Sequence, residues 1–168
     1  MARVAEVGPF SRFDGVDRTL AMLSGRGLRL TTDELGTHRT VVLNVDSEPY
    51  RFVGEGIVSA DLIDDDGVTD FNVMTRRARC SHNLRRLIVT EPITITADVV
   101  IFFVAAGQVA CRNDATPIST EIEALGGEAI VARSDNAGRD SPAHLSIACT
   151  DSGTATVLVA QVYFRSLS

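Results

Sequence analysis

Alternation of apolar and polar residues over short runs is the feature of this sequence that most restricts its fold. In the run Asp17–Leu23, even-numbered and odd-numbered side chains fall on opposite faces of an extended chain. Roughly a dozen such runs, separated by Gly, Pro and Asp, predict an all-β barrel or sandwich. The further strands are predicted at Leu28–Thr31, Arg39–Val45, Tyr50–Phe52, Val58–Ile63, Val68–Thr75, Leu84–Thr90, Ile93–Ala97, Val99–Ala105, Glu128–Arg133, His144–Cys149 and Thr156–Phe164.

The connections between these runs give three local expectations. The glycine-rich turn at residues 24–27 predicts a hairpin between the first run and Leu28–Thr31. Thr120–Leu125 fits either one helical turn or the edge of a sheet. The polar segment Ser134–Pro142 is expected to be a loop.

Chain length favours one domain, or one barrel built from two similar halves. The 168 residues, of which 45% are hydrophobic, suffice for a buried core. We predict a single domain over residues 1–168, with possible subdomains at about 1–76 and 77–168, because the strand rhythm pauses near Arg76–Leu84.

Charge and composition restrict the partners. The net charge of −6 argues against nucleic acid, which requires a basic surface. A local basic cluster is either a solvated face or the start of an anion site, and it comprises Arg76, Arg77, Arg79, Arg85 and Arg86. The sequence shows no signal peptide, no apolar run long enough for a bilayer and no Cys-x-x-Cys pair. We therefore expect a cytoplasmic protein that binds neither nucleic acid nor membrane.

Catalytic and metal-binding motifs are weak in this sequence. The three histidines stand apart, and Asp64–Asp66 lacks the alternation of a calcium loop. Gly25 and Gly27 open a strand rather than a helix, so a dinucleotide cofactor is not indicated. Ser11 lies in no nucleophile elbow. We predict no metal, no cofactor and no identified catalytic residue.

Arg18 and Asn72 are the residues best suited to bind a ligand. An arginine guanidinium is always charged and its donors fit a carboxylate, while an asparagine amide both donates and accepts. Arg76 shares a strand face with Asn72 if that strand continues. The alternative roles are an ion pair of Arg18 with Asp17 or Asp14, and satisfaction of backbone groups by Asn72.

Two segments resemble signatures of the HutD/Ves family of cupin-like proteins. The first is Gly8-Pro9-Phe10-Ser11-Arg12-Phe13-Asp14-Gly15-Val16-Asp17-Arg18-Thr19, and the second is Asp70-Phe71-Asn72-Val73-Met74-Thr75-Arg76-Arg77. The segment Tyr50–Gly54 between them keeps the family's order and spacing. The resemblance covers the first half of the chain, and the second half agrees only in its strand rhythm.

This resemblance implies a bicupin-like fold, in which two small β-barrels of the double-stranded β-helix type share strands. It also implies a pocket for a small carboxylate and an association with bacterial histidine utilisation, with formate or a formyl or formimino derivative of glutamate as ligand. Carried over by position, Arg18 would clamp the carboxylate. Ser11, Asn72, Met74 and Arg76 would line the pocket.

The sequence departs from the family at its start. Family members carry a Trp-Lys-Asn-Gly-Gly-Gly type motif before the first strand, whereas this chain has no Trp. Either the start of the chain is assigned too late, or the chain is a short member of the family. A missing segment would leave a sheet edge unpaired and favour a homodimer or aggregation.

Three functions follow from these observations. The first is a non-enzymatic carboxylate-binding regulator or flux limiter of histidine utilisation. The second is a cupin-type isomerase or hydrolase of an amino-acid derivative, with Asp17, Asp70 or a histidine as base. The third is a protein-interaction module with a vestigial pocket. Enzymatic activity is therefore left open, with binding alone favoured.

Overall fold

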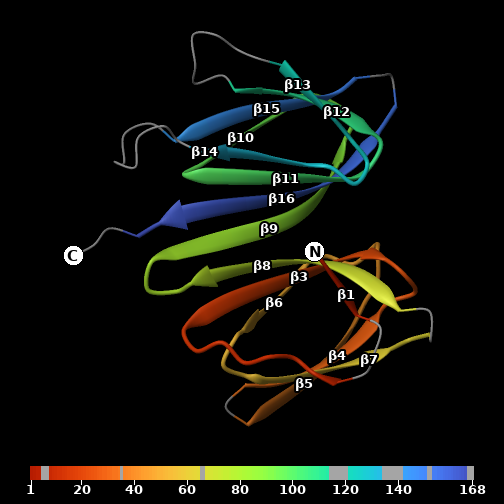
Figure 1. Ribbon diagram of the computed structural model, residues 1–168, viewed down its shortest axis with the longest axis vertical. Helices are drawn as coiled ribbons and strands as arrows, with labels where there is room; N and C mark the ends of the chain where they lie inside the picture. Colours follow the sequence, from red (N-terminus) through yellow and green to blue (C-terminus); the bar gives the residue numbers. More distant parts are fainter. Residues whose placement is uncertain are drawn as a thin grey trace. The chain divides into compact units, whose positions relative to one another are not determined.

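The computed structural model describes residues 1–4, 8–34, 36–64, 67–113, 121–133, 142–150 and 153–165. This part of the chain contains β-strands and no helix, which confirms the all-β prediction (Figure 1). The strands are β1 (Ala2–Val4), β2 (Gly8–Pro9), β3 (Val16–Ser24), β4 (Leu28–Glu34), β5 (Thr37–Leu43), β6 (Tyr50–Val53), β7 (Ile57–Leu62), β8 (Val68–Arg76), β9 (Cys80–Val89), β10 (Ile93–Ala97), β11 (Val99–Ala106), β12 (Gln108–Asn113), β13 (Glu121–Leu125), β14 (Ala129–Arg133), β15 (Ala143–Cys149) and β16 (Ala155–Phe164).

The chain divides into two compact units, Met1–Ser81 and His82–Ser166. The N-terminal unit contains two four-stranded sheets, which we name sheet A, of order β1-β8-β3-β6, and sheet B, of order β2-β7-β4-β5. Sheet A contributes Leu20, Met22 and Phe52 to a shared hydrophobic core, and sheet B contributes Leu28 and Leu30. These side chains alternate along their strands, as the sequence pattern predicts for two facing sheets.

The C-terminal unit is also built from two four-stranded sheets. Sheet C has the order β14-β11-β16-β9, and sheet D has the order β10-β15-β12-β13. Val100, Phe102 and Val104 of β11 face a core that also includes Val109 and Ile147 of sheet D. In both units the pairing leaves the sheets open, so neither unit is a closed ring of strands.

The two units repeat one topology. If β9 to β16 are numbered from one to eight, sheets C and D have the same strand orders as sheets A and B, which is the order of a jelly roll (Figure 1). The β-bulges match as well, because pairing shifts between Met22 and Ser24 in β3 and between Val104 and Ala106 in β11. This match places Val100 of β11 at the position of Arg18 in β3.

The predicted hairpin after Leu23 is wrong. β3 pairs with β6 and β8, whereas β4 pairs with β5 and β7, so residues 24–27 carry the chain from sheet A to sheet B. A hairpin within one sheet and a connection between two facing sheets have the same sequence signal, because a short glycine turn between two alternating runs occurs in both. For Thr120–Leu125, where either one helical turn or the edge of a sheet was expected, the structure has a strand, β13. The predicted loop at Ser134–Pro142 lies outside the described residues except for Pro142.

The turn between sheets A and B requires its glycines. Gly25 and Gly27 have φ angles of +92° and +128°, which L side chains rarely adopt. A Cβ atom on Gly27 would lie 2.4 Å from the carbonyl oxygen of Leu43, and the Gly27 carbonyl accepts the Ile63 amide at 3.1 Å. The chain therefore passes between neighbouring backbones where no side chain fits.

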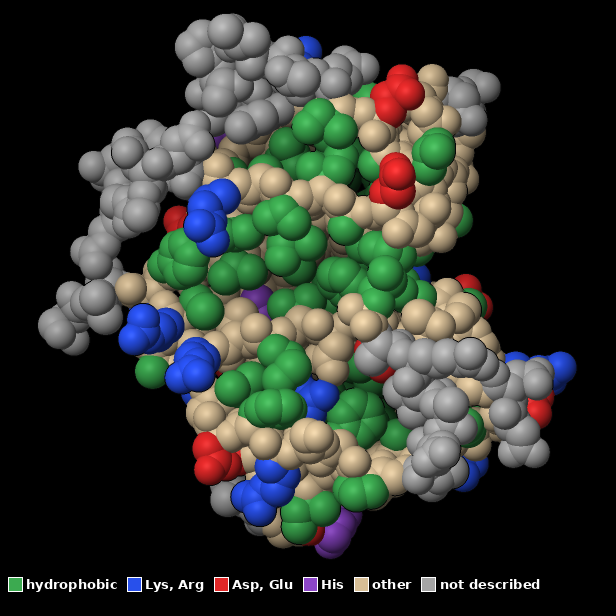
Figure 2. Space-filling view, in the orientation of Figure 1, with side chains coloured by type: hydrophobic (Ala, Val, Ile, Leu, Met, Phe, Trp, Pro, Cys, Tyr) green, Lys and Arg blue, Asp and Glu red, His purple; other side chains and the backbone are tan. Residues whose placement is uncertain are grey.

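Hydrophobic side chains are also found at the surface, as Figure 2 shows between polar groups. Ile57, Ile88 and Val131 are 64%, 70% and 64% exposed. Because more than half of a typical protein surface is apolar, such single side chains require no special role. Within the described part of the chain, no helix is long and apolar enough to cross a membrane.

We expect Gly27→Ala to lower the free energy of unfolding by about 2 kcal/mol or more, because it combines a positive φ with a backbone clash. The matched control is Gly36→Ala, which has a φ of +80° but no atom within 4 Å of the added Cβ. Urea unfolding of both variants measures the difference. Equal losses in the two variants would contradict the close approach at Gly27.

Candidate functional site

Arg18 enters the interior of the N-terminal unit from β3. Its side chain shares the inner face of sheet A with Leu20 and Met22, and the residue is only 5% exposed. In the strand register, Met74 of β8 lies on one side of Arg18 and Phe52 of β6 lies on the other. Arg18 therefore places a charge on the same face of β3 as the core residues Leu20 and Met22.

Three phenyl rings surround the guanidinium of Arg18. Its central carbon lies 5.0 Å from the ring centres of Phe10 and Phe52 and 5.6 Å from that of Phe13. The rings of Phe10 and Phe52 meet edge to face at 6.1 Å. Each such contact contributes about 0.5–2 kcal/mol, so the rings partly offset the loss of water around the charge.

The aromatic segment before β3 is fixed by backbone contacts. The amides of Phe10 and Phe13 each donate at 2.8 Å, to the carbonyls of Val58 and Gly54. Gly54 permits this approach, because a Cβ atom there would lie 2.6 Å from the Phe13 carbonyl. The rings are therefore held in place by the sheet and not by the guanidinium alone.

Arg18 has few polar contacts for a buried cation. Its Nη1 donates to the backbone carbonyl of Ser11 at 3.1 Å, and its buried Nε has no hydrogen-bond partner among the described residues. Burial lowers the pKa of the guanidinium, against the opposing charge of Asp70. An arginine remains protonated even so, and the site keeps a positive charge whose Nε donor has no partner among the described residues.

Asp70 and Asn72 lie on the inner face of β8, on the strand next to Arg18. Asp70 is 1% exposed, and its Oδ1 is a buried acceptor for which the described residues supply no donor. The same holds for Oδ1 of Asn72. Burial raises the pKa of Asp70 to about 6, against the opposing charges of the N-terminal amine and Arg18. We name Arg18, Phe10, Phe13, Phe52, Asp70 and Asn72 the Arg18 cluster.

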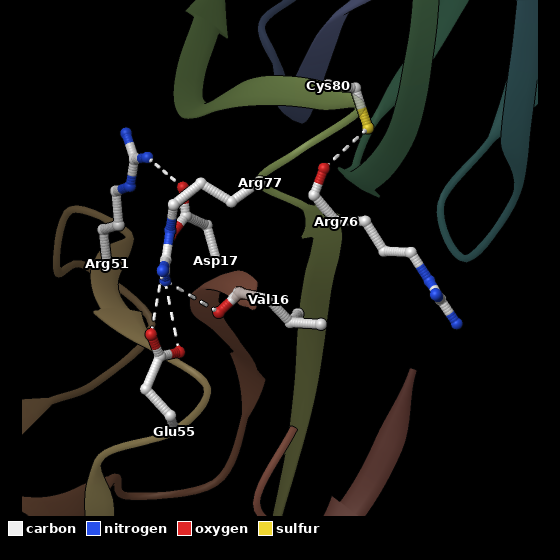
Figure 3. Close-up of polar contacts among 7 residues, drawn as sticks. All are labelled: Val16, Asp17, Arg51, Glu55, Arg76, Arg77 and Cys80. Atoms are coloured by element: carbon white, nitrogen blue, oxygen red, sulfur yellow. Dashed lines mark hydrogen bonds and ion pairs between the residues drawn. The ribbon is translucent and has the colours of Figure 1, made fainter. Parts of the chain in front are cut away.

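Asp17 belongs to a different network on the opposite face of sheet A. It accepts hydrogen bonds from Arg51 at 2.7 Å and from Arg77 at 2.8 Å (Figure 3). Arg77 also bonds Glu55 at 2.8 Å. Burial raises the pKa of Asp17, but the bonds from Arg77 and Arg51 outweigh it and hold that pKa below its usual range. The alternative role of Arg18 as the ion-pair partner of Asp17 is therefore wrong.

The other predicted site residues are Ser11, Met74 and Arg76, and the structure places each of them differently with respect to Arg18. Ser11 reaches Arg18 through its backbone carbonyl and is itself exposed. Met74 lies opposite Arg18 in the register and is 40% exposed. Arg76 ends β8 with an exposed side chain, which Figure 3 shows directed away from the Asp17 carboxylate. Their role in binding stays a prediction.

The C-terminal unit is apolar at the positions that match the Arg18 cluster. Val100 takes the place of Arg18, and Val157 and Val159 of β16 take the places of Asp70 and Asn72. All three valines are fully buried, with 0% exposure. The jelly roll therefore folds without any charge at these positions, and the Arg18 cluster is not a requirement of the fold.

A hollow lies in the C-terminal unit, on the outer face of sheet D. It has a volume of about 400 Å³ and a floor of small residues that includes Ala110, Ser146 and Ala148. Arg112 and Glu123 stand at its sides. Its side chains alternate with the core residues Cys111 and Ile147, so this hollow faces away from the core.

Metal ligands are not grouped in the described part of the chain, where no three His, Cys, Asp or Glu side chains come together. The Arg18 cluster offers one carboxylate, one amide and a guanidinium, which is a set suited to an organic ligand rather than a metal. The cysteines Cys80, Cys111 and Cys149 are free thiols, and burial raises the pKa of Cys111 to about 11.

Sequence reasoning missed the aromatic part of the cluster. Phe10 and Phe13 are three residues apart in an irregular segment, and Phe52 comes from a distant strand, so no periodic signal joins them. The position of Asp70 could be inferred from the sequence, because Asp70 follows the buried Val68 by two residues on β8 and therefore lies on the same face of the strand. Sequence reasoning considered it only as one of several possible bases.

The comparisons with known proteins place this chain among cupin-like proteins. The HutD family model matches residues 1–156. Protein Ves of Escherichia fergusonii is 34% identical over 85 residues, which is 51% of this chain and 42% of that protein. The chain thus covers less than half the length of this curated relative.

Solved structures agree over nearly the whole chain. A conserved protein of unknown function from Pseudomonas aeruginosa PAO1 has a TM-score of 0.79 and 23% identity, covering 98% of this chain and 80% of that one. HutD from Pseudomonas fluorescens SBW25, in a formate condition, has a TM-score of 0.71 and 21% sequence identity, and the match covers 98% of this chain and 77% of that one. A Bacillus subtilis oxalate decarboxylase has a TM-score of 0.64 and 6% sequence identity, and the match covers 98% of this chain and 67% of that one. The predicted bicupin-like fold is confirmed.

We expect Asp70→Asn to raise the free energy of unfolding by up to about 3 kcal/mol above pH 6 and to change it little near pH 4. The native pKa lies above the unfolded value of 3.8, so the folded protein holds this proton more tightly. Wild-type stability therefore falls as the pH rises from about 4 to about 6, and the variant lacks this loss.

Urea unfolding at pH 4 and pH 8 measures this difference. The matched control is Asp61→Asn on β7, whose carboxylate lies on the outer part of the same unit and is only partly buried. A stability gap for Asp70→Asn that is the same at both pH values would show that Asp70 is not buried as a strained carboxylate.

Proposed function

The chain belongs to the HutD family, a cupin-type family associated with histidine utilisation, and we propose that it binds a small carboxylate at Arg18 without converting it. In this proposal the protein acts in the cytoplasm as a regulator or flux limiter of histidine utilisation. Formate and the formyl or formimino derivatives of glutamate are the candidate ligands.

The observation that carries this proposal is the incompletely bonded guanidinium of Arg18. It is 5% exposed and surrounded by aromatic rings, and within the described part of the chain its hydrogen bond goes to the neutral carbonyl of Ser11. A carboxylate could accept two parallel bonds from such a guanidinium, and the low dielectric would strengthen both. The rings leave the charge in place without neutralising it.

Two further observations support a binding role. The solved HutD from Pseudomonas fluorescens was studied in a formate condition, which makes formate the simplest probe for this chain. The C-terminal unit places valines where the N-terminal unit has Arg18, Asp70 and Asn72, so one site per chain is expected.

One observation favours an enzyme as the second candidate. Burial raises the pKa of Asp70 to about 6, close to neutral pH, where a carboxylate serves well as a general base. An isomerase or hydrolase would use Arg18 to hold the carboxylate of its substrate and Asp70 to take a proton. Incubation of the protein with N-formyl-glutamate or formimino-glutamate, followed by NMR, detects any turnover.

We expect formate and N-formyl-glutamate to raise the melting temperature of the wild type and to have no effect on Arg18→Ala. A ligand at a hundred times its dissociation constant stabilises by about 2.7 kcal/mol, which corresponds to several degrees for a chain of this size. Arg18→Lys should retain only part of the shift, because an ammonium cannot donate bidentately. A thermal-shift titration measures all three proteins.

The matched control is Arg29→Ala, which removes an exposed arginine from β4 of the same unit. Its ligand-induced shift should equal that of the wild type. If no carboxylate shifts the wild type, or if Arg18→Ala keeps the full shift, the proposal is wrong. Absence of any shift would favour the third hypothesis, an interaction module, for which a co-purifying partner is the next observation.

A further inference from the structure

The N-terminal unit buries two opposite charges that do not meet. Arg18 of β3 and Asp70 of β8 both face its core and are 5% and 1% exposed. Each charge influences the pKa of the other, and the N-terminal amine lowers the pKa of Asp70 more than Arg18 does. No ion pair within 4.0 Å joins Arg18 and Asp70 in the described part of the chain. Burial of a charge without its partner is costly, so this separation needs an explanation.

From this separation we propose that the ligand is a zwitterion, whose carboxylate binds Arg18 and whose cationic nitrogen binds Asp70. The inference rests on the proposed function, since it concerns the same site, and it narrows the ligand from any small carboxylate to one that also carries an ammonium or amidinium group.

The hydrogen-bonding character of Asp70 determines which group of the ligand it can bind. An ionised carboxylate has only acceptor oxygens, and Oδ1 of Asp70 is buried without a donor in the described structure. In the proposal, the ligand brings an N–H or O–H group to this end of the site. A cationic nitrogen is the strongest such donor, because hydrogen bonds between charged groups are about twice as strong as neutral ones.

Asn72 is compatible with the same ligand. It follows Asp70 by two residues on the same face of β8 and lies opposite Leu20 in the register. Its buried Oδ1 also has no donor among the residues that the structure describes, although an amide can turn to present either its oxygen or its NH2 group. Asn72 can thus either donate a hydrogen bond to the ligand or accept one, whereas the ionised carboxylate of Asp70 can only accept.

The C-terminal unit shows that these charges are not structural. Val157, which matches Asp70, and Val100, which matches Arg18, fill the same places of the second jelly roll at 0% exposure. A hydrophobic residue of similar volume would therefore serve the fold better at Asp70. A charge kept where the fold prefers valine is best explained by a ligand.

Isosteric ligand pairs test the proposal directly. Glycine and propionate, β-alanine and butyrate, and γ-aminobutyrate and valerate differ only by an ammonium in place of a methyl group. For the pair whose length suits the site, calorimetric titration at pH 7.5 should show the amino acid binding about tenfold or more tightly than its isostere. Both members of each pair should lose binding in Arg18→Ala.

The variant Asp70→Asn separates the two claims. It should lose the preference for the amino acid while it still binds the isostere, because Arg18 is intact. Asp61→Asn, the same substitution on β7, should keep the full preference. Near-UV circular dichroism of each variant, compared with the wild type, verifies that the fold is retained.

The outcomes distinguish this inference from the proposed function. Equal Arg18-dependent binding of isostere and amino acid would overturn the zwitterion and leave carboxylate binding intact. A preference that persists in Asp70→Asn would also overturn the role of Asp70. If no member of any pair binds the wild type, and formate does not bind either, then carboxylate binding itself is wrong.

Discussion

The removal of Arg18 from water is the constraint on which the candidate site depends. Alternation along β3 directs this side chain into the interior between sheets A and B, where its neighbours in step are Leu20 and Met22. Water cannot solvate the charge there, so Phe10, Phe13 and Phe52 and the carbonyl of Ser11 take over part of that task. They compensate the charge incompletely, because rings and a neutral carbonyl bring no negative charge. This shortfall makes the site attractive to an anion.

The repeated topology allows the cost of the site to be judged within one molecule. Both units place eight strands in the same order with a bulge at the same point, yet only the N-terminal unit carries charges at the matched positions. Val100, Val157 and Val159 show what the fold itself favours there, which is tight apolar packing. The polar residues of the N-terminal unit lower its stability relative to such packing. Functional sites commonly carry such a cost.

The sequence predicted what depends on neighbouring residues and missed what depends on distant ones. The strands follow from local alternation, and β10 has the predicted bounds, Ile93–Ala97. Arg18 and Asn72 could be singled out because each has a chemistry and a strand position of its own, and their role in binding stays a prediction. The partners of β3 were missed, since β6 and β8 are brought to it by long-range pairing. The aromatic wall was missed for the same reason, because Phe52 reaches Arg18 only across the sheet. Two similar halves were expected from the chain length and from the family resemblance, but no residue pattern marks the repeat, because the two units share a strand order and not a sequence.

The separation of Arg18 from Asp70 is itself a product of the surrounding structure. A direct ion pair would satisfy both groups and leave the interior closed to a ligand. The rings hold the guanidinium at the Phe52 end of the sheet, where Arg18 pairs with Met74, while Asp70 pairs with Met22 further along β3. Leu20 and Asn72 occupy the register position between them. Because the backbone amides that anchor Phe10 and Phe13 fix these rings independently of the charge, the guanidinium is held away from the carboxylate. The sheet thus fixes two complementary charges at separate register positions, and such preorganisation favours the selective binding of a small polar molecule.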